Sequence, residues 1–471
     1  MVLGDMFERF IQDAPMPVLF RLLMERALDP GELDRMFEST ATSQYTREVL
    51  FSSIVDLMAA VVCRVKPSVR RAYLDYSGIA ATLTAVYEKL KGTEPMVCRS
   101  LVQTTSKRLA EVVRQLEPDR PASLPGYRVK VFDGNHLAGT EHRIPETRDI
   151  WEAVLPGQTL AVYDLDLGLV IDAIPCEDAH AQERTLLAEM LSDCGPTDLW
   201  MGDRNFCVAW WFLEVSRRGN CFLVRQHATA IHIEPLEEFV VIGRVATGEV
   251  QEQRVRVVEM NGHGAPQRDE RGRPREIEMR RVRVMLDEPT QGGDTEILLL
   301  SNVPASDADA LVLSQLYLRR WTIENGFQTM TEVLRCEINT LAYPKAALLG
   351  FCVALVGFNI LAAVRSALRS EHGTETVEKD VSSYHVMCEV RETHRGMMIA
   401  LPPESWAQFR ALSLAEFAEL LREVASQVNL RKYPLSHRKP KAAGARRKPR
   451  KNKRCQHTAT ARLLNQRKPK R

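Results

Sequence analysis

The segment YRVKVFDGNHL at residues 127–137 opens a series of short apolar runs that decides the fold. Runs rich in β-branched and aromatic residues, bounded by turn residues, predict strands, and runs with helical spacing separate the later strands. The expected elements are strands at Tyr127–Phe132, Thr159–Asp164 and Leu167–Ile174, a helix at Ala181–Leu191, a strand at Leu199–Gly202, a helix at Cys207–Arg217 and a strand at Cys221–Arg225. This alternation predicts an α/β domain.

Three strands, a helix, a strand, a helix and a strand is the element order of a ribonuclease H-like domain, in which the first and fourth strands are neighbours. We expect residues 126–230 to form the first part of this domain and residues 306–370 the second part. Between them, residues 231–305 alternate apolar and charged positions, as in Arg254-Val255-Arg256-Val257. Such alternation predicts a β-rich insertion with half-solvated strands.

Two carboxylates directly follow expected strands. Asp133 comes after the first strand in VFDGN, and Asp203 comes after the fourth in WMGDRN. Since these strands are expected to be neighbours, both carboxylates should lie at one edge of the sheet on a rigid backbone. We interpret other strand-end carboxylates as turn residues (Asp164 and Asp166) or as weaker candidates (Asp172 and Asp178).

The segment LYLRRWTIENGFQTMT at residues 316–331 predicts one amphipathic helix. Helical geometry places the polar side chains of Tyr317, Arg320, Glu324, Gln328 and Thr331 on one narrow stripe. An apolar stripe lies beside it, formed by Leu316, Ile323, Phe327, Met330 and Leu334. An ordinary Arg–Glu pair on a partly solvated helix explains the same spacing, so the stripe alone does not decide the function.

The conjunction of Asp133, Asp203 and Glu324 on three neighbouring elements predicts a site made only of oxygen ligands. Such a site suits Mg²⁺ or Mn²⁺ and not zinc. Two of these ions clamp the attacking and leaving oxygens of a phosphodiester. The residues therefore predict metal-dependent chemistry on a nucleic-acid backbone.

Three sequence blocks resemble the signature blocks of bacterial insertion-sequence transposases of the DDE type. They are VFDGNHL, WMGDRNF and the Y-x₂-R-x₃-E pattern within residues 316–331. More narrowly, they resemble the family with a Tyr–Arg–Glu signature and a β-strand insertion before the Glu. The 121 residues from Asp203 to Glu324 leave room for that insertion. The resemblance covers roughly residues 60–370.

This resemblance implies a function and a set of site residues. Asp133, Asp203 and Glu324 would bind two Mg²⁺ (or Mn²⁺) ions, hydrolyse DNA at the element ends and join the 3′-hydroxyl to target DNA. DNA phosphates would be contacted by Tyr317, Arg320, Arg204 and Arg225, with Gln328 as a further helix residue facing the DNA. The tryptophans Trp210, Trp211 and Trp321 would stack on bases or, as we favour, pack in the core. The family also implies a homodimer on paired DNA ends.

One position departs from the family pattern. The signature often extends to a Lys seven residues after the Glu, where this chain has Thr331. A phosphate-binding cation is therefore missing from the expected helix. Two alternatives to a transposase stay open: a metal-dependent nuclease without strand transfer, and a DNA-binding protein whose catalytic site has decayed.

The flanking regions differ sharply in charge. Residues 431–471 hold 17 Lys and Arg and no Asp or Glu, whereas residues 1–430 hold 46 basic and 61 acidic residues, a net charge of −15. We expect a disordered basic tail that binds nucleic acid, the alternative being a solubilising tail. Residues 1–125 predict a helical domain that either binds DNA or is a plain bundle, and residues 371–430 predict a further helical segment.

Two observations concern the cellular location. The apolar run Ala346–Phe358 is short for a membrane span, so we expect a buried core helix and no membrane. Ten cysteines without paired metal-ligand spacing, and a charged start in MVLGDMFERF, are typical of reduced thiols in a bacterial cytoplasm.

Overall fold

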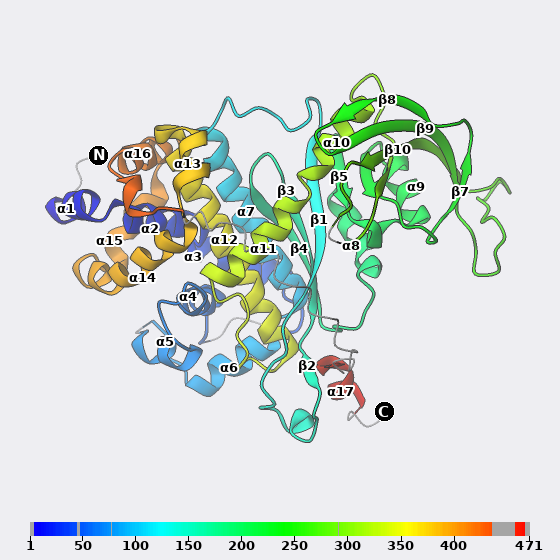
Figure 1. The fold of residues 1–471 in the computed structure, drawn as a ribbon. Helices are drawn as coiled ribbons and strands as arrows, with labels where there is room; N and C mark the ends of the chain where they lie inside the picture. Colours follow the sequence, from blue (N-terminus) through cyan, green and yellow to red (C-terminus); the bar gives the residue numbers. More distant parts are fainter. Residues whose placement is uncertain (1–3, 45–47, 77, 291, 436–456, 467–471) are drawn as a thin grey trace, which may run out of the picture.

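A computed structural model describes residues 4–44, 48–76, 78–290, 292–435 and 457–466. Its centre is one mixed sheet of ten strands in the order β4-β3-β1-β5-β6-β11-β10-β9-β7, with β8 paired to β9 (Figure 1). The five strands expected from the sequence are β1 (Arg128–His136), β3 (Gln158–Asp164), β4 (Leu169–Cys176), β5 (Asp198–Gly202) and β6 (Cys221–Arg225). The pairing of β1 with β5 is parallel, which confirms that the expected first and fourth strands are neighbours.

The expected β-rich insertion continues the central sheet. Its strands, which we call the β-extension, are β7 (His232–Pro235), β8 (Val240–Val245), β9 (Gly248–Val258), β10 (Glu276–Leu286) and β11 (Glu296–Ser301). The last of them, β11, pairs antiparallel with β6, with Leu300 opposite Val224. The β-extension therefore shares backbone hydrogen bonds with the sheet that carries the expected site.

Helix α12 (Pro344–His372) is the apolar centre of the helical half. In the described residues it is the one helix long and apolar enough to cross a membrane, and 89% of its most apolar window is buried inside the protein. It packs against α2 (Pro15–Ala27), α4 (Phe51–Val62), α7 (Pro95–Leu116) and α16 (Leu414–Ser426). This burial matches the expectation of a core helix.

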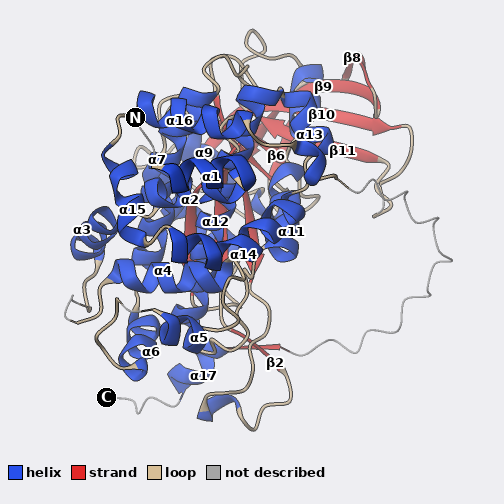
Figure 2. Cartoon of the chain, turned by 90° about the vertical axis from the view of Figure 1, so that its left-hand side faces the viewer, coloured by secondary structure: helices blue, strands red, loops and turns tan. Residues whose placement is uncertain are grey.

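Helices from both ends of the chain surround α12 (Figure 2). The remaining ones are α1 (Asp5–Asp13), α3 (Pro30–Thr40), α5 (Val69–Asp75), α6 (Leu83–Gly92), α13 (Thr374–Asp380), α14 (Ser383–Ala400) and α15 (Pro403–Ala407). Apolar residues from Phe7 to Tyr433 belong to one buried cluster. The expected N-terminal and C-terminal helical regions thus share a single core, while DNA binding by residues 1–125 stays a prediction.

Two expected helices have a different form. The one expected at Ala181–Leu191 is a 3₁₀ turn (Glu183–Leu186), a short α8 (Leu187–Met190) and a second 3₁₀ turn (Leu191–Asp193). The one expected across residues 316–331 is divided into α10 (Ala310–Leu318) and α11 (Trp321–Val333). The amides of Arg319 and Arg320 bond to carbonyls three residues earlier, so the chain tightens at this point. The expected helix at Cys207–Arg217 is α9 (Ala209–Arg217).

The expectation of a fully disordered tail at 431–471 is wrong for residues 431–435 and 457–466. Residues 431–435 continue a 3₁₀ turn (Leu430–Lys432) and bury Tyr433. Residues 457–466 form β12 (His457–Ala459) and α17 (Thr460–Gln466), which lie beside β2 (Ala153–Leu155) near the lower edge of Figure 1. Strand β12 pairs parallel with β2, and the guanidinium of Arg462 contacts the carboxylate of Asp178 at 2.9 Å. Paired backbone and an ion pair supply interactions that the tail's composition does not reveal. Residues 436–456 and 467–471 lie outside the described residues.

Candidate active site

Asp133 and Asp203 occupy equivalent positions on neighbouring strands. The parallel pairing of β1 and β5 ends with Val131 opposite Met201, and each carboxylate follows two residues later. We expected Asp133 to follow the end of the first strand, but β1 continues to His136 and Asp133 lies inside it. The amide of Gly134 donates to Asp133 Oδ1 at 2.9 Å, and the amide of Asn205 donates to Asp203 Oδ1 at 2.8 Å. The backbone therefore orients both side chains.

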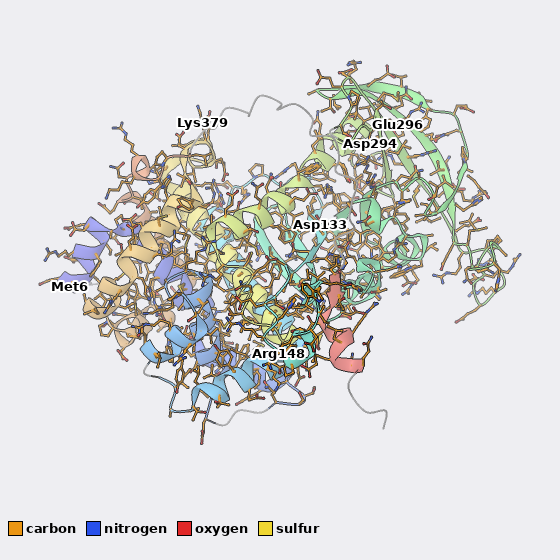
Figure 3. The ribbon with its side chains drawn as sticks, turned by 60° about the horizontal axis from the view of Figure 1, so that its bottom comes forward. Met6, Asp133, Arg148, Asp294, Glu296 and Lys379 are labelled. Carbon is orange, nitrogen blue, oxygen red and sulfur yellow. The ribbon has the colours of Figure 1, made fainter. Side chains whose placement is uncertain are left out.

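Glu324 approaches from α11, and Arg320 lies between it and the strands. Arg320 Nη1 is 2.7 Å from Glu324 Oε1 and 3.8 Å from Asp133 Oδ2. The Arg320 side chain is 7% exposed, and its Cζ lies 5.0 Å from the centre of the Trp321 ring. One buried guanidinium thus brings together two of the three expected carboxylates. In Figure 3, Asp133 lies between the helical half and the β-extension, which carries Asp294 and Glu296.

Tyr317, on the last turn of α10, also points into the protein. Its hydroxyl donates to the carbonyl of Gly202 at 3.3 Å, and the residue is 6% exposed. This contact ties α10 to the residue that precedes Asp203. The expected contacts of Tyr317 and Arg320 with DNA phosphates stay a prediction, because both side chains have protein partners in this structure.

The carboxylates crowd one another in a partly buried space. Burial and the charge of Asp203 raise the pKa of Asp133 to about 7, with Glu324 adding and Arg320 opposing. Burial also raises the pKa of Asp203, although the Asn205 amide and Arg320 oppose this shift. Excess negative charge of this kind is relieved by a cation.

Three carboxylates without a thiolate or imidazole have the donor chemistry for Mg²⁺ or Mn²⁺. Within the described residues, however, no three His, Cys, Asp or Glu side chains are arranged to hold one metal ion. Asp133 and Glu324 converge on Arg320 and not on a shared metal position. The physical reason is the guanidinium itself, which neutralises Asp133 and Glu324 and lies between them.

The other expected DNA contacts lie around this centre. Arg204 is exposed and its charge lowers the pKa of Asp203, though less than the Asn205 amide does. Arg225, at the end of β6, contacts Asp294 of the β-extension at 2.8 Å. Gln328 is exposed and donates to Glu332 at 3.0 Å. Contacts of these side chains with DNA stay a prediction.

A cation that the sequence did not reveal lies near Thr331. Arg64, from the end of α4, donates from Nη2 to the Thr331 carbonyl at 3.2 Å and to the Leu334 carbonyl at 3.0 Å. Arg64 has φ 58°, the one positive φ among the described non-glycine residues. Position 331, where the family signature often has a Lys, therefore lies beside the guanidinium of Arg64. No local feature of the sequence predicts this contact.

The weaker candidates have structural roles. Asp164 accepts the amide of Leu167 and is a turn residue as predicted. Asp166 lies in the turn itself, and its carboxylate accepts the amide of Ser123 from a distant segment. Asp172 is buried against Arg99 at 2.8 Å. Asp178 holds the C-terminal segment through Arg462. Neither Asp172 nor Asp178 joins the carboxylate site.

The three tryptophans divide between the core and the surface. Trp211 is fully buried, and Trp210 packs half-buried against the same apolar cluster. Trp321 is 55% exposed, so our expectation of core packing is wrong for this residue. It covers Arg320 instead, because the tightened turn before α11 leaves the indole at the surface.

Glu183 and His136 were not singled out from the sequence. Glu183 begins the first 3₁₀ turn after β4, and its Oε1 lies 3.7 Å from Nδ1 of His136 on β1. Its carboxylate also lies against Gly134, where an added Cβ would overlap it. The Gly after the first carboxylate in VFDGN is the one sequence signal for this close approach.

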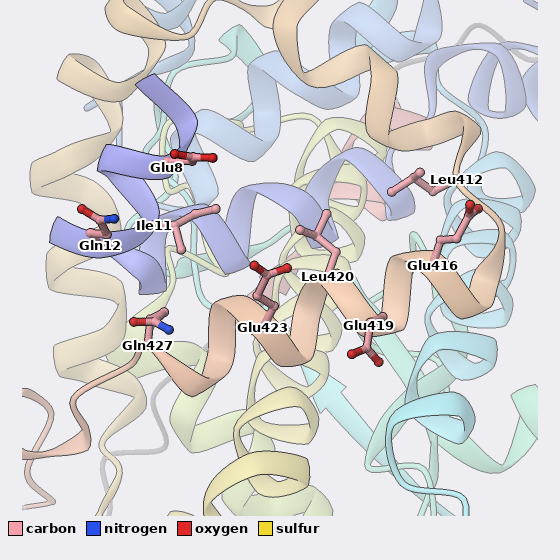
Figure 4. Close-up of a pocket in the computed structure, with 9 residues that line it drawn as sticks. All are labelled: Glu8, Ile11, Gln12, Leu412, Glu416, Glu419, Leu420, Glu423 and Gln427. Carbon is pink, nitrogen blue, oxygen red and sulfur yellow. The ribbon is translucent and has the colours of Figure 1, made fainter. Parts of the chain in front are cut away.

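A separate groove of about 470 Å³ lies between α1 and α16 (Figure 4). Its polar lining is mainly acidic, with Glu8, Glu416, Glu419 and Glu423. This charge disfavours phosphate. The groove is therefore no rival to the carboxylate site for nucleic acid.

Comparison with known proteins gives one family match. Residues 125–354, just under half of the chain, match the family model of the transposase DDE domain. No curated protein matches the chain. A solved structure, the cryo-EM structure of a piggyBac transposase synaptic complex with hairpin DNA, is 11% identical with a TM-score of 0.40. That similarity covers 88% of this chain and 86% of the other, and it decides neither fold nor function.

Proposed function

We propose that this chain is a DNA transposase of a bacterial insertion sequence, which cuts the element ends and joins the 3′-hydroxyl to target DNA. The observation that carries the proposal is the placement of Asp133 and Asp203 at matching positions of two paired strands, with Glu324 joined to Asp133 through Arg320, within the segment that matches the transposase DDE domain. The charges of Asp203 and Glu324 both raise the pKa of Asp133, although long stretches of chain separate the three residues. Ordinary strand-end residues have no reason to converge in this way.

Asp133, Asp203 and Glu324 would hold two divalent cations, Mg²⁺ or Mn²⁺. When bound, these cations supply an activated water or 3′-hydroxyl and stabilise the leaving oxygen. The protein contributes rigid positions for Asp133 and Asp203, whose Oδ1 atoms accept backbone amides. Because Asp133 lies within β1 and Asp203 directly follows β5, both ligands are held more precisely than ligands on a loop would be, which suits in-line displacement at phosphorus.

Arg320 would exchange partners when DNA binds. Its Nε and Nη1 have no hydrogen-bond partner of suitable geometry, although Nη1 lies close to Glu324. A buried guanidinium with unused N–H groups is available to a phosphate oxygen, which suits bidentate contacts. We propose that Arg320 binds the scissile phosphate when divalent cations replace it at the carboxylates. The flanking phosphates would be contacted by Tyr317, Arg204, Arg225 and Gln328.

The basic tail and the partner copy belong to the same proposal. The Lys and Arg residues of 431–471 would add sequence-independent affinity for DNA. Two copies would act on paired element ends in the bacterial cytoplasm. The role of the tail rests on its charge, and the dimer rests on the family resemblance.

A plasmid assay tests the function. A supercoiled donor carrying the DNA that flanks this gene is incubated with the full chain and Mg²⁺, with Asp203→Asn as the control. A transposase produces excised donor and a joined product, both absent with Asp203→Asn. Linear donor without joined product would instead support a nuclease, and no metal-dependent product would support a decayed DNA-binding protein.

A further inference from the structure

A cavity of about 550 Å³ lies where the elements that carry Asp133 and Glu324 lead away from the carboxylate site. One wall is formed by residues 137–140, which directly follow β1, and another by residues 334–340, which directly follow α11. Thr331, on the last turn of α11, also lines it. Since a helix rises about 1.5 Å per residue, the cavity begins roughly 10 Å from Glu324 along α11.

Two half-buried arginines, Arg64 and Arg335, line this cavity. Arg64 donates to the carbonyls of Thr331 and Leu334, and Arg335 donates to the carbonyl of Pro67. Both guanidiniums thus bond to neutral backbone oxygens, and among the ion pairs of the described chain none includes either of them. A carbonyl accepts a hydrogen bond without neutralising the charge, so two positive charges remain in the cavity without a counter-charge in contact.

The lining of the cavity is positive although the body of the protein is acidic. Its one acidic residue is Glu337, whose carboxylate accepts the amide of Ala138 at 2.9 Å. Residues 1–430 together carry a net charge of −15. A concave site that is locally positive within an acidic body attracts anions to one place.

The backbone of Arg64 has a conformation that glycine normally takes. It follows the end of α4 with φ 58°, where a Cβ atom costs free energy and Gly is the usual residue. Its Nε is also buried without a hydrogen-bond partner in the described residues. Capping of α11 explains the two carbonyl contacts but not the unbonded Nε. Backbone strain and an unused donor at one residue are typical of a binding position.

We propose that Arg64 and Arg335 bind a phosphodiester of the DNA strand about three nucleotides from the scissile phosphate. This inference rests on the proposed function, which brings that strand to Asp133 and Glu324. One strand of DNA carries a phosphate about every 3.4 Å along the helix axis, so an offset of roughly 10 Å corresponds to about three nucleotides. Guanidinium groups suit this ligand because they donate two parallel N–H bonds to phosphate oxygens. The arginines would supply the positive charge that Thr331 lacks.

Ethylation interference tests the position of this contact. The full chain is bound to a duplex that carries the DNA flanking this gene, in EDTA so that no cleavage occurs. Ethylation removes the charge of single phosphates, and with the unaltered chain it should weaken binding at one or two phosphates about three nucleotides from the cleavage site. Arg64→Gln and Arg335→Gln should each abolish the interference there and leave it unchanged at other phosphates.

The salt dependence of affinity for the same duplex gives a second measurement. Each Gln variant should lower the slope of log affinity against log salt by about one, because one phosphate contact is lost. Arg64→Lys and Arg335→Lys keep the charge and should keep the slope. Arg9→Gln is the matched control: it removes an exposed arginine of α1 that lies outside the cavity, and it should leave both measurements unchanged.

A purely structural role of the arginines predicts a different result. Thermal unfolding would then occur at lower temperature in the Lys and Gln variants alike, while the folded variants kept the interference pattern and the salt slope of the unaltered chain, and this would overturn the inference. If the unaltered chain binds and cuts the duplex with Mg²⁺ but neither measurement changes in the variants, only the phosphate site fails. If the unaltered chain does not bind the duplex, the proposed function fails and the inference with it.

Discussion

Two buried arginines of this chain face carboxylates in opposite ways. Arg99, on α7, donates from Nε and Nη2 to the two oxygens of Asp172 at 2.9 and 2.8 Å, and Gln103 donates to the same carboxylate. Arg320 lies 2.7 Å from Glu324 and 3.8 Å from Asp133, yet its Nε and Nη1 lack hydrogen-bond partners. Both arginines are nine-tenths buried.

The two arginines differ in how completely the protein itself satisfies their hydrogen-bonding groups, which separates a structural ion pair from a ligand site. A bidentate pair with additional donors holds α7 to β4 and leaves no polar group unused. The Arg320 guanidinium, which lies between Asp133 and Glu324 with Nε unbonded, leaves interactions for a ligand to complete. Arg99 belongs to the N-terminal region for which we predict either DNA binding or a plain bundle, and its pairing with Asp172 gives it a structural role.

The largest effect should come from the site carboxylates. Asp133→Asn, Asp203→Asn or Glu324→Gln should each lower DNA cleavage by at least about a thousandfold, because each removes a metal ligand, while the fold remains intact. A nicking assay on supercoiled plasmid with Mg²⁺ measures this loss. Full cleavage by any one variant would remove that residue from the site.

Asp172→Asn should lower the stability of the fold, in contrast to the site variants, which should lower activity. It leaves the buried Arg99 without its counter-charge, so we expect the free energy of unfolding to fall by about 3–5 kcal/mol. Urea unfolding followed by circular dichroism measures this change. Equal stability of Asp172→Asn and Asp133→Asn would erase the distinction between the two arginines.

Arg320→Gln should act in two directions. Loss of the internal cation should tighten Mn²⁺ binding without DNA by about tenfold, since the carboxylates lose their competing partner. DNA cleavage should fall by about a hundredfold because a phosphate-binding group is lost. Titration with Mn²⁺ and the plasmid assay measure the two effects. Weaker Mn²⁺ binding in Arg320→Gln would contradict the competition between guanidinium and metal.

The pH dependence of Mn²⁺ binding should be a smaller effect than the losses caused by these substitutions, and it reports on the protonation of Asp133. Burial and Asp203 raise the pKa of Asp133 to about 7, so the folded protein protonates this group more readily than the unfolded chain. Stability from this residue is present below the pKa of an unfolded Asp and is lost as pH rises through about 7. Mn²⁺ affinity should rise over the same range, because binding needs the ionised carboxylate.

Isothermal titrations with Mn²⁺ at pH 6 and pH 8 check this dependence. Asp133→Asn should lose the part of it that centres near pH 7. A pH profile unchanged by that substitution would show that another group controls the titration.

The smallest effect should come from the basic tail. Replacing its Lys and Arg between residues 438 and 454 by Gln keeps β12 and α17, which anchor the tail to β2 and Asp178. Non-specific DNA affinity should fall about threefold at moderate salt, and the salt dependence should flatten, because fewer counterions are released. Fluorescence anisotropy at several salt concentrations measures both. An unchanged slope would mean that the tail does not bind DNA.

Much of the sheet could be predicted from the sequence. The strands around Asp133 and Asp203 carry strong local patterns, and their order along the chain predicted correctly that β1 and β5 are neighbours. The burial of Ile323, Met330 and Leu334 likewise follows from helical spacing. The patterns that predict these features are local in the sequence, although the pairing and the burial themselves join distant parts of the chain.

From the sequence alone, most strands and helices, the charge contrast between body and tail, and the three carboxylates of the candidate site could be predicted. Tertiary structure decided that Arg320 lies between Asp133 and Glu324, that Glu183 lies over Gly134, and that residues 457–466 pair with β2. Periodicity records which face of an element is buried, but not which distant group meets it there. That choice depends on packing and charge balance across the whole fold, where groups far apart in sequence compete for the same space.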